Sequence, residues 1–319
     1  MAEPAERKLL SIVIPCYGSE HTLVPVVEEI RETMKGLPGF DYELILVNDC
    51  SPDNVGEVIK KLAKEDNRVT GIMLARNFGQ HAAVLAGFRE AKGDYLLCLD
   101  DDGQTPPAEA PKLLRALEAG ADVVYAKYGK KMHSGFRNFG SHMNELMLRI
   151  MLGKPKELYV SSYFAVKRFV AENMMLYENA YPYLIGLALR ATKNIVNVEV
   201  EHRKREVGSS GYTLAKLIGL WLNGFTAFSI LPLRVATFLG GFLAATGFAY
   251  GIYTVIKKLV NPSVPAGFSA MMSGLVFIGG VEMLMLGIIG EYLGRMYLSM
   301  NRTPQYVVRE VIRSDETGK

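Results

Sequence analysis

The sequence predicts an α/β protein with a mostly parallel sheet, followed by a hairpin of two long apolar helices. Three observations support this prediction. Short apolar runs alternate with stretches of helical length over the first two hundred residues or so, which is the pattern of βαβ units. Polar clusters follow several of these runs, as expected at the ligand-binding edge of such a sheet. Apolar residues are concentrated after about residue 213.

The expected strands are short apolar runs bounded by polar or turn residues. They cover residues 9–15, 42–48, 69–74, 94–99, 122–126, 159–166 and 195–201. Helices are expected over residues 20–34, 54–64, from 81 to 91, after Pro107 and over 138–151. Polar clusters at Tyr17, Asp49, residues 76–81 and residues 100–104 follow successive strands, so we expect these four loops to converge on one cleft.

The segment of residues 96–107 is the centre of this pattern. An apolar strand ends there in three consecutive carboxylates, Asp100, Asp101 and Asp102. Their mutual repulsion would be relieved by Mg²⁺ or Mn²⁺, which take oxygen ligands from one or two carboxylates and from substrate phosphates. Side chains alternate along an extended segment, so Asp100 and Asp102 lie on one side and Gln104 can add an amide oxygen. The alternative is a solvated acidic turn.

Composition and missing motifs exclude several classes of function. The net charge is +3, which implies no strong field for nucleic acid. The chain has neither the glycine fingerprint of dinucleotide-binding proteins nor a P-loop. Its three cysteines lack paired spacing, which favours a reducing compartment over a disulfide framework. The polar start followed by a short apolar run is not a cleavable signal.

The apolar part predicts attachment to a membrane. Residues 213–232, with the one tryptophan Trp221, suit a helix at the interface. Residues 235–256 and 268–289 are each long enough to span a bilayer core, which needs about 20 residues. The expected organisation is therefore a cytosolic domain over 1–212, the interfacial helix, a transmembrane hairpin over 233–298 and a cytosolic tail over 299–319. Glycines in both spans permit close packing, and we expect a homo-oligomer.

Position along the chain suggests roles for a basic segment and for one carboxylate. Residues 127–137 carry basic side chains without interleaved acids, and beside a cleft they suit a lipid phosphate, with Arg137 first and Lys130 and Lys131 next. A solvated charged face is the alternative. Glu282 falls within the second span, where we expect a structural contact between helices rather than a catalytic role.

Five motifs together resemble one family. They are Ile14-Pro-Cys-Tyr17, Val47-Asn-Asp49, Asn77-Phe-Gly-Gln-His-Ala-Ala83, Asp100-Asp-Asp-Gly-Gln-Thr-Pro-Pro107 and Arg205-Glu-Val-Gly-Ser-Ser-Gly-Tyr212. With the apolar hairpin, they resemble the polyprenyl-phosphate (dolichyl- or undecaprenyl-phosphate) glycosyltransferases of glycosyltransferase family 2. The resemblance covers nearly the whole chain and implies a GT-A fold.

The resemblance also implies roles for individual residues. Pro15, Tyr17 and Asp49 would contact the base and ribose of a nucleotide. Asp100, Asp102 and Gln104 would hold metal and diphosphate, and Asp101 would orient the acceptor or a sugar hydroxyl. The loop over residues 202–212 would close over the donor diphosphate, with Arg203 or Arg205 as its basic residue and with Ser210 and Tyr212 in support. A flexible linker into the membrane part is the alternative. This chain departs from the common Pro-x-Tyr-Asn-Glu pattern, because Gly18 and Ser19 follow Tyr17.

The function implied is inverting, metal-dependent transfer of one sugar from a nucleotide-sugar to a polyprenyl phosphate, for cell-envelope glycan modification. UDP is the preferred nucleotide and GDP stays open; the sugar and the lipid length are not specified. The expected place is the cytoplasmic face of the inner (plasma) membrane. A processive polysaccharide synthase is one alternative, although the Gln-x-x-Arg-Trp motif of those enzymes is absent. A non-enzymatic membrane scaffold is the other.

Cys16 and Cys50 both follow strands beside the expected donor pocket. Free cysteines are usually small buried residues. The competing hypothesis is that at least one of the two is reachable and that a thiol reagent blocks donor binding.

Overall fold

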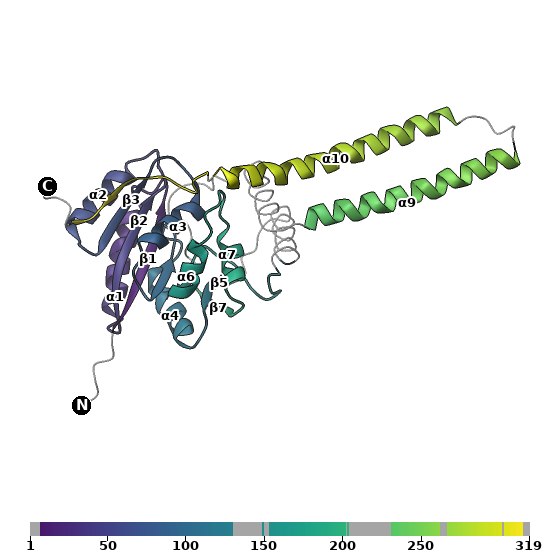
Figure 1. Cartoon of the computed structure of the whole chain (residues 1–319). Coiled ribbons are helices and arrows are strands. Elements are labelled where there is room, and N and C mark those ends of the chain that lie inside the picture. The colour runs from purple at the N-terminus through teal and green to yellow at the C-terminus, as the bar shows by residue number, and fades with distance from the viewer. Residues whose placement is uncertain are drawn as a thin grey trace. The chain divides into compact units, whose positions relative to one another are not determined.

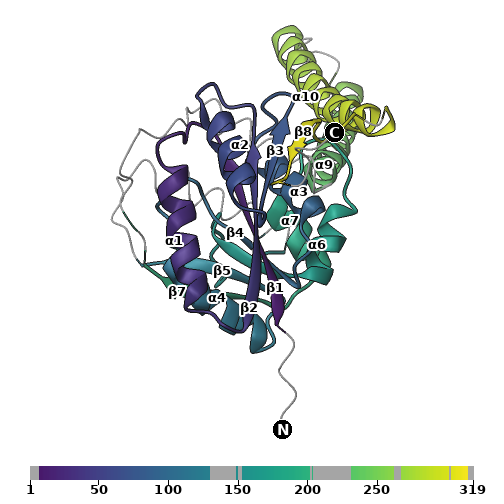
Figure 2. The same cartoon turned by 90° about the vertical axis from the view of Figure 1, so that its left-hand side faces the viewer.

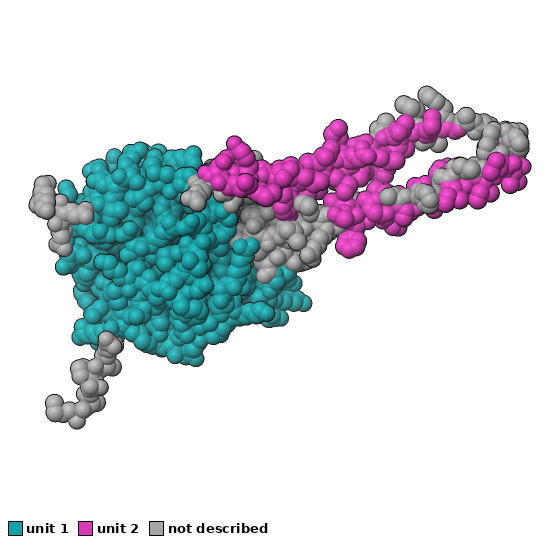
Figure 3. All heavy atoms as spheres, in the orientation of Figure 1, with its two compact units in different colours: residues 1–217, 302–319 teal, residues 218–301 magenta. Residues whose placement is uncertain are grey.

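A computed structural model of the chain describes residues 7–129, 149, 153–201, 203, 231–261, 267–301 and 303–314. The chain divides into two compact units (Figure 3). One comprises residues 1–217 together with 302–319, and the other comprises residues 218–301. The described part of the first unit is an α/β structure, and that of the second consists of two long helices (Figure 1).

The first unit is built on a mostly parallel sheet, as predicted. Its described strands are ordered β7-β5-β6-β4-β1-β2-β3-β8. Strands β1, β2, β3 and β4 run parallel to their neighbours among these four, as do β5 and β7, whereas β6 and β8 pair antiparallel. The strands are β1 (Lys8–Cys16), β2 (Phe40–Asn48), β3 (Val69–Leu74), β4 (Tyr95–Cys98), β5 (Val123–Tyr128), β6 (Phe164–Lys167), β7 (Ile195–Val200) and β8 (Val308–Ile312).

Helices cover both faces of this sheet (Figure 2). One side carries α1 (Leu23–Lys35), α2 (Val55–Glu65) and α4 (Ala110–Glu118), which follows the 3₁₀ turn η1 (Pro107–Glu109). The other side carries α3 (Gln80–Glu90), α6 (Arg168–Met175) and α7 (Leu184–Ala191). A sheet buried on both faces explains why its strands are continuous apolar runs.

The alternation of side chains along β1 divides the core between the two layers. Ile12 and Ile14 belong to the cluster that includes α1, α2 and α4. Val13 points to the other face, where α3 crosses so closely that a Cβ on Gly87 would lie 2.3 Å from a Val13 methyl carbon. Glycine at this position therefore lets α3 lie directly on β1 and β2, which fixes the start of α3 at the carboxyl ends of the strands.

The last strand was not predicted. Residues 299–319 were expected to form a cytosolic tail, but Val308–Ile312 pairs antiparallel with β3 at the edge of the sheet. The segment is further tied down by the Arg313–Glu90 ion pair and by Gln305, which donates to the carbonyls of Tyr177 and Asn179 at 3.2 Å each. The first unit is therefore completed by residues that follow the second unit in sequence.

Two other expectations need correction or lie outside the description. The strand expected over residues 159–166 is shorter and begins at Phe164, because Ser161 uses its hydroxyl to bind the carbonyls of Ala126 and Tyr163. The helix expected over 138–151 lies outside the described residues except for Arg149. Helices α6 and α7 were not predicted.

The second unit contains α9 (Leu231–Val260) and α10 (Phe268–Met300). Many large apolar side chains along both helices are exposed, including Phe238, Leu259 and Met283. Among the described helices, α10 is the one whose length and composition suffice to cross a membrane, over Phe277–Gly294. Helix α9 contains a shorter apolar stretch at Ala236–Gly247. The interfacial helix expected over residues 213–232 lies outside the described residues up to residue 230.

Candidate active site

The four predicted loops meet at the carboxyl ends of β1, β2, β3 and β4, as expected for an open α/β sheet. The loop after β1 is joined to the loop after β4 by the Tyr17 amide, which donates to Asp101 Oδ2 at 2.9 Å. The loop after β3 is joined to the loop after β4 by Gln80, which donates to Asp100 Oδ1 at 2.9 Å. These contacts confirm the predicted convergence of the loops.

Asp100 occupies the centre of the cluster, and both of its oxygens are hydrogen-bonded. Gln80 donates to one oxygen, and the hydroxyl of Ser162 donates to the other. The Asp100 amide in turn donates to the Thr105 hydroxyl at 3.1 Å. Burial, opposed by the Ser162 hydrogen bond and reinforced by the charges of Asp102 and Asp101, raises the pKa of Asp100 to about 6. These contacts fix the orientation of the Asp100 carboxylate. Burial and the neighbouring negative charges destabilise its charged form, so a nearby positive charge would stabilise it.

The other two carboxylates are held by different partners. Asp101 accepts the Tyr17 amide, and burial raises its pKa. Asp102 Oδ1 accepts the amide of Gln104 at 3.0 Å, which closes a tight turn around Gly103 (φ 74°). Positive φ is readily adopted by glycine. The turn fixes the backbone between Asp102 and Gln104, and the charge of Asp102 is close enough to Asp100 to help raise its pKa.

Asp49 is buried and anchors the neighbouring loop. Its Oδ1 accepts the Phe78 amide at 2.7 Å and its Oδ2 accepts the Gly79 amide at 2.8 Å. Burial raises the pKa of Asp49, although these two hydrogen bonds oppose the shift. Asp49 thereby positions the start of α3, which carries Gln80 to Asp100. The contact with base or ribose expected for Asp49 stays a prediction.

The loop after β1 presents one aromatic side chain to solvent. Tyr17 is 53% exposed, whereas Pro15 is buried in β1 beside Val47. Gly18 takes a positive φ of 72°, and its amide donates to the Ser51 hydroxyl at 2.8 Å. Tyr17 is therefore available for stacking on a base, while Pro15 fixes the backbone beneath it.

The two cysteines beside this edge differ in exposure. Cys16 is fully buried, and burial raises the pKa of its thiol well above the usual range. Cys50 is exposed and adopts a positive φ of 52°, which is uncommon for a residue with a side chain. The expectation that at least one of the two is reachable is confirmed for Cys50.

Arg203 approaches the site through its backbone, while its side chain is bound elsewhere. Its amide donates to the Gln104 carbonyl at 3.3 Å. Its guanidinium binds both carboxylate oxygens of Glu29 on α1, at 2.7 and 2.9 Å. The predicted contact of Arg203 with donor diphosphate would require this ion pair to open. Five other predicted residues, Lys130, Lys131, Arg137, Arg205 and Ser210, lie outside the described residues, as does Tyr212.

Three residues at the site were missed by the sequence analysis as functional candidates. Gln80 lies within a quoted motif, but no pattern pointed its amide at Asp100. Ser162 comes from the segment before β6, some sixty residues further along the chain, and no local signal pairs it with Asp100. Tyr128, at the end of β5, lies close enough to Asp100 for that charge to help burial raise the pKa of its phenol.

The oxygen donors present suit a hard divalent cation. Among the described residues, no three histidine, cysteine or carboxylate side chains are grouped as a closed metal cage. Mg²⁺ and Mn²⁺ do not need one, because one or two carboxylates with substrate phosphates hold them. Asp100, Asp102 and the Gln104 amide would supply such a partial set of oxygen ligands, and their role as metal ligands stays a prediction.

Comparison with known proteins now identifies the family. Residues 11–176 match the family model "Glycosyl transferase family 2". The chain belongs to glycosyl transferase family 2. Residues 231–296 also match the family model "GtrB C-terminal hairpin". This family 2 enzyme is therefore a glycosyltransferase whose C-terminal helices have a counterpart in related proteins.

Curated relatives of this glycosyltransferase extend over its full length. The undecaprenyl-phosphate 4-deoxy-4-formamido-L-arabinose transferase of Proteus mirabilis is 33% identical over 313 residues, which cover 97% of this chain and 96% of the relative. The protein of the same name from Yersinia enterocolitica is 32% identical over 320 residues, covering 99% and 98%. These alignments extend over residues of both units.

Solved structures support the fold. Glucosyl-3-phosphoglycerate synthase from Mycobacterium tuberculosis, in complex with Mn²⁺, UDP and phosphoglyceric acid, has a TM-score of 0.52 and 18% sequence identity. The comparison covers 69% of this chain and 78% of that one. The complex of that synthase with Mn²⁺ and UDP-glucose gives a TM-score of 0.52 at 19% identity, with coverage of 69% and 77%. The family 2 chain thus has the GT-A-like α/β architecture expected from its sequence.

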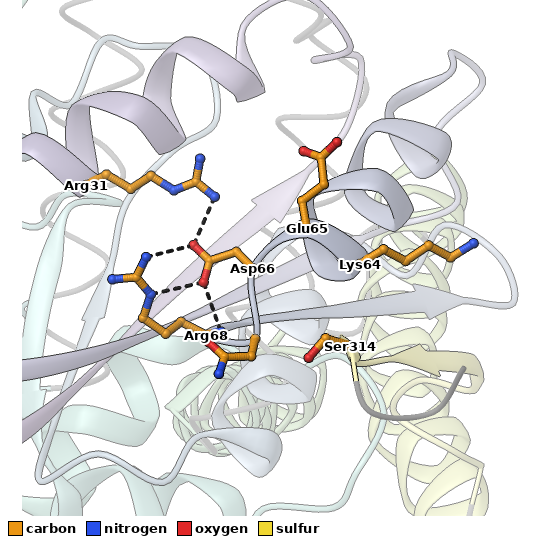
Figure 4. A pocket seen from close by; sticks show the side chains of 7 residues that line it. Arg31, Lys64, Glu65, Asp66, Arg68 and Ser314 are labelled. Atoms are coloured by element: carbon orange, nitrogen blue, oxygen red, sulfur yellow. Dashed lines mark hydrogen bonds and ion pairs between the residues drawn. The ribbon is translucent and has the colours of Figure 1, made fainter. Parts of the chain in front are cut away.

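A polar pocket at the opposite edge of the sheet is distinct from this site. It is lined by Arg31, Arg68 and Asp66, among other residues between α2 and β3 (Figure 4). Asp66 receives hydrogen bonds from both guanidinium groups, at 2.9 to 3.0 Å. The hydrogen bond from Arg68 is the largest cause that lowers the pKa of Asp66, to about 2. The lining carries three basic side chains and two acidic ones, and the ion pairs of Asp66 with Arg31 and Arg68 make the pocket a structural ion cluster at the amino end of β3.

Proposed function

We propose that this glycosyltransferase transfers one sugar, with inversion, from a nucleotide-sugar to a polyprenyl phosphate. The observation that carries the proposal is the fixed carboxylate Asp100, with Asp102 and Gln104, at the convergence of four loops. Relatives that match the whole chain act on undecaprenyl phosphate by name, which supports that lipid class as the acceptor. UDP is the preferred carrier and GDP the alternative.

The proposal places α9 and α10 across the membrane as a hairpin. Helix α10 is long and apolar enough to span, and the match to the GtrB hairpin model covers both helices. Residues 302–319 belong to the same unit as residues 1–217, which we call the catalytic unit. Both ends of the hairpin therefore lie on one side of the membrane. We place that side in the cytoplasm, where nucleotide-sugars are made, and the hairpin in the inner membrane. Close packing of hairpins would support a homo-oligomer.

In the proposed mechanism, the chain positions two anionic substrates. Mg²⁺ or Mn²⁺, when bound, neutralises charge that develops on the leaving diphosphate. Asp100 and Asp102 hold this cation, with Gln104 as a further oxygen donor. Asp101 keeps the Tyr17 loop against the site, so that Tyr17 can cover the base while Pro15 and Asp49 shape the nucleotide pocket. The basic residues Lys130, Lys131 and Arg137 are proposed to bind the acceptor phosphate.

The acceptor needs little activation. A phosphate monoester has its second pKa near about 6, so its oxygen is already ionised at neutral pH. The chain's contribution is therefore orientation and charge screening rather than proton removal. An attack from the face opposite the diphosphate inverts the anomeric configuration: the phosphate oxygen bonds to the anomeric carbon as the bond to the diphosphate breaks. Arg203, Arg205, Ser210 and Tyr212 are proposed to screen the leaving diphosphate.

Sugar transfer in detergent tests this proposal. Full-length protein would receive undecaprenyl phosphate, Mg²⁺ or Mn²⁺ and a panel of labelled UDP- and GDP-sugars that includes UDP-linked 4-deoxy-4-formamido-L-arabinose. We expect a lipid-soluble labelled product from one donor, and none from the Asp102→Asn variant. Metal-dependent binding of nucleotide without a lipid product from any donor would contradict the proposal and favour a scaffold.

A further inference from the structure

The catalytic unit exposes an unusual group of side chains around Gln305. The loop between α6 and α7 presents Leu176, 78% exposed, and Tyr181, 55% exposed. Tyr181 holds a positive φ of 60°, a conformation that is uncommon for a residue with a side chain. Val307, 43% exposed, follows in the segment before β8. Three apolar side chains are thus exposed on two segments of the same unit.

Hydrogen bonds connect the chain segments that carry these residues. Gln305 is 8% exposed and donates to the carbonyls of Tyr177 and Asn179, which fixes the loop to the C-terminal segment. The Ala75 amide donates to the Val307 carbonyl at 2.8 Å. Arg309 donates to the Ala75 carbonyl at 3.2 Å. Exposed Arg76 follows Ala75. We define the edge patch as Leu176, Tyr181, Val307, Arg76 and Arg309.

We propose that the edge patch is a membrane-contacting surface of the catalytic unit, whose partner is the lipid bilayer. The inference rests on the proposed function, because it takes α9 and α10 as membrane spans. The chain provides the continuity. Gln305 follows Asn301, the last residue of the helical unit, after only four steps, which extend over at most about 14 Å. Gln305, which fixes the loop, is therefore separated from the last residue of the helical unit by this length of chain at most.

The chemistry of the edge patch suits a bilayer interface. Tyrosine combines an apolar ring with a polar hydroxyl and is favoured at the level of the lipid headgroups. Leucine and valine can enter the acyl boundary, while arginines bind anionic lipid phosphates. A soluble partner protein, unlike the bilayer, would not be held beside the end of the hairpin.

The loop also reaches the active site from its other end. Tyr183 packs edge-on against the ring of His81, with centroids 5.4 Å apart. His81 follows Gln80, whose amide binds Asp100. The loop between α6 and α7 therefore carries exposed apolar residues, and Tyr183 at its end contacts a neighbour of the site.

Quenching by brominated lipid tests the inference on the full-length protein in nanodiscs. The native thiols permit a clean background, because Cys16 and Cys98 are buried and Cys50 is the exposed one. In a Cys50→Ser chain, Leu176→Cys and Tyr181→Cys would each carry a bimane label. Met283→Cys on α10 serves as the membrane control, and Lys35→Cys at the end of α1 serves as the exposed control away from the patch.

We expect lipids brominated near the headgroup to quench the labels at 176 and 181, because interfacial groups enter by roughly 5–10 Å. Lipids brominated deep in the acyl chains should quench the label at 283. The label at 35 should not respond. Quenching at 283 with none at 176 or 181 would overturn the inference and leave the hairpin and the proposed function standing. No quenching at 283 would overturn both the hairpin and the inference. If the label at 176 responded to a second copy of the chain and not to lipid, the patch would be a subunit contact and the inference would be overturned.

Discussion

Replacement of Ser162 by alanine tests whether Asp100 is a metal ligand held in place by its neighbours. The Ser162 hydroxyl donates to one oxygen of Asp100, while Gln80 holds the other. A hydrogen bond to a charged group contributes about 1.5–3 kcal/mol. Loss of a partner that orients a metal ligand typically weakens metal binding by about 10–100-fold. Because Gln80 remains in the variant, we expect Ser162→Ala to weaken Mn²⁺ binding by about ten-fold, at the lower end of this range.

The neighbouring residue provides a matched control. The Ser161 hydroxyl donates to the carbonyls of Ala126 and Tyr163, both at 2.8 Å, and has no hydrogen bond to Asp100. Ser161→Ala therefore removes the same chemical group from the same segment. Free Mn²⁺ would be measured by electron paramagnetic resonance during titration of the solubilised protein with UDP present. Equal Mn²⁺ affinities in the Ser161→Ala and Ser162→Ala variants would refute the reasoning.

The pH dependence of the same titration gives a second readout. In the metal-free protein the pKa of Asp100 is raised to about 6, mainly by burial, and Ser162 opposes the rise. Below that pKa a proton occupies the carboxylate, so Mn²⁺ affinity should fall as the pH falls through about 6. Without Ser162 the pKa rises further, and we expect the fall in affinity to begin at a higher pH. A pH profile identical to that of the unchanged protein would contradict this assignment.

Three further outcomes are expected. Asp66→Asn should lower the free energy of unfolding at pH 7 by about 1–2 kcal/mol after allowance for solvent screening, because Arg68 and Arg31 hold the pKa of Asp66 at about 2. This stabilisation is fully present above the unfolded pKa of about 3.9 and is lost as the pH falls towards about 2, so thermal melts of the two proteins should converge in acid. Gly87→Ala should destabilise the protein by about 1–3 kcal/mol in the same melts, because the new methyl group would meet Val13; an unchanged melting temperature would show that α3 can move away. Alkylation of Cys50 should be slowed by bound nucleotide and absent in Cys50→Ser, as mass spectrometry would show; a rate unaffected by nucleotide would place Cys50 away from the donor.

Much of the catalytic unit was predictable because its signals are local. Strand β3 has the predicted bounds, and β1, β2 and β4 differ from prediction by one or two residues at their ends. The convergence of the loops after these strands follows from the parallel order of the sheet. The acidic segment at Asp100 was recognisable because three adjacent carboxylates at a strand end repel one another, which favours a site that binds a cation.

The remainder depends on contacts between distant parts of the chain. Ser162 and Gln80 meet at Asp100 only after β3, β4 and the segment before β6 are brought together. The ion pair of Arg203 with Glu29 joins residues 174 positions apart. Strand β8 is short and partly charged, so its sequence is typical of a polar tail. Its pairing with the edge of β3 is visible only in the structure. Such pairings leave no periodic trace in the sequence.

Because β8 follows α9 and α10 in sequence, the segments that form the catalytic unit are synthesised partly before and partly after these two helices. A ribosome that has completed β3 must still produce more than two hundred residues, including α9 and α10, before the strand that covers the edge of β3 emerges. Until then, the nascent unit keeps an unpaired strand edge, which is prone to pair with other chains. Both helices are therefore synthesised before the sheet can close. If they span the membrane as proposed, a chain whose helices fail to insert keeps the edge of β3 exposed for longer, and quality control would recognise it by that edge.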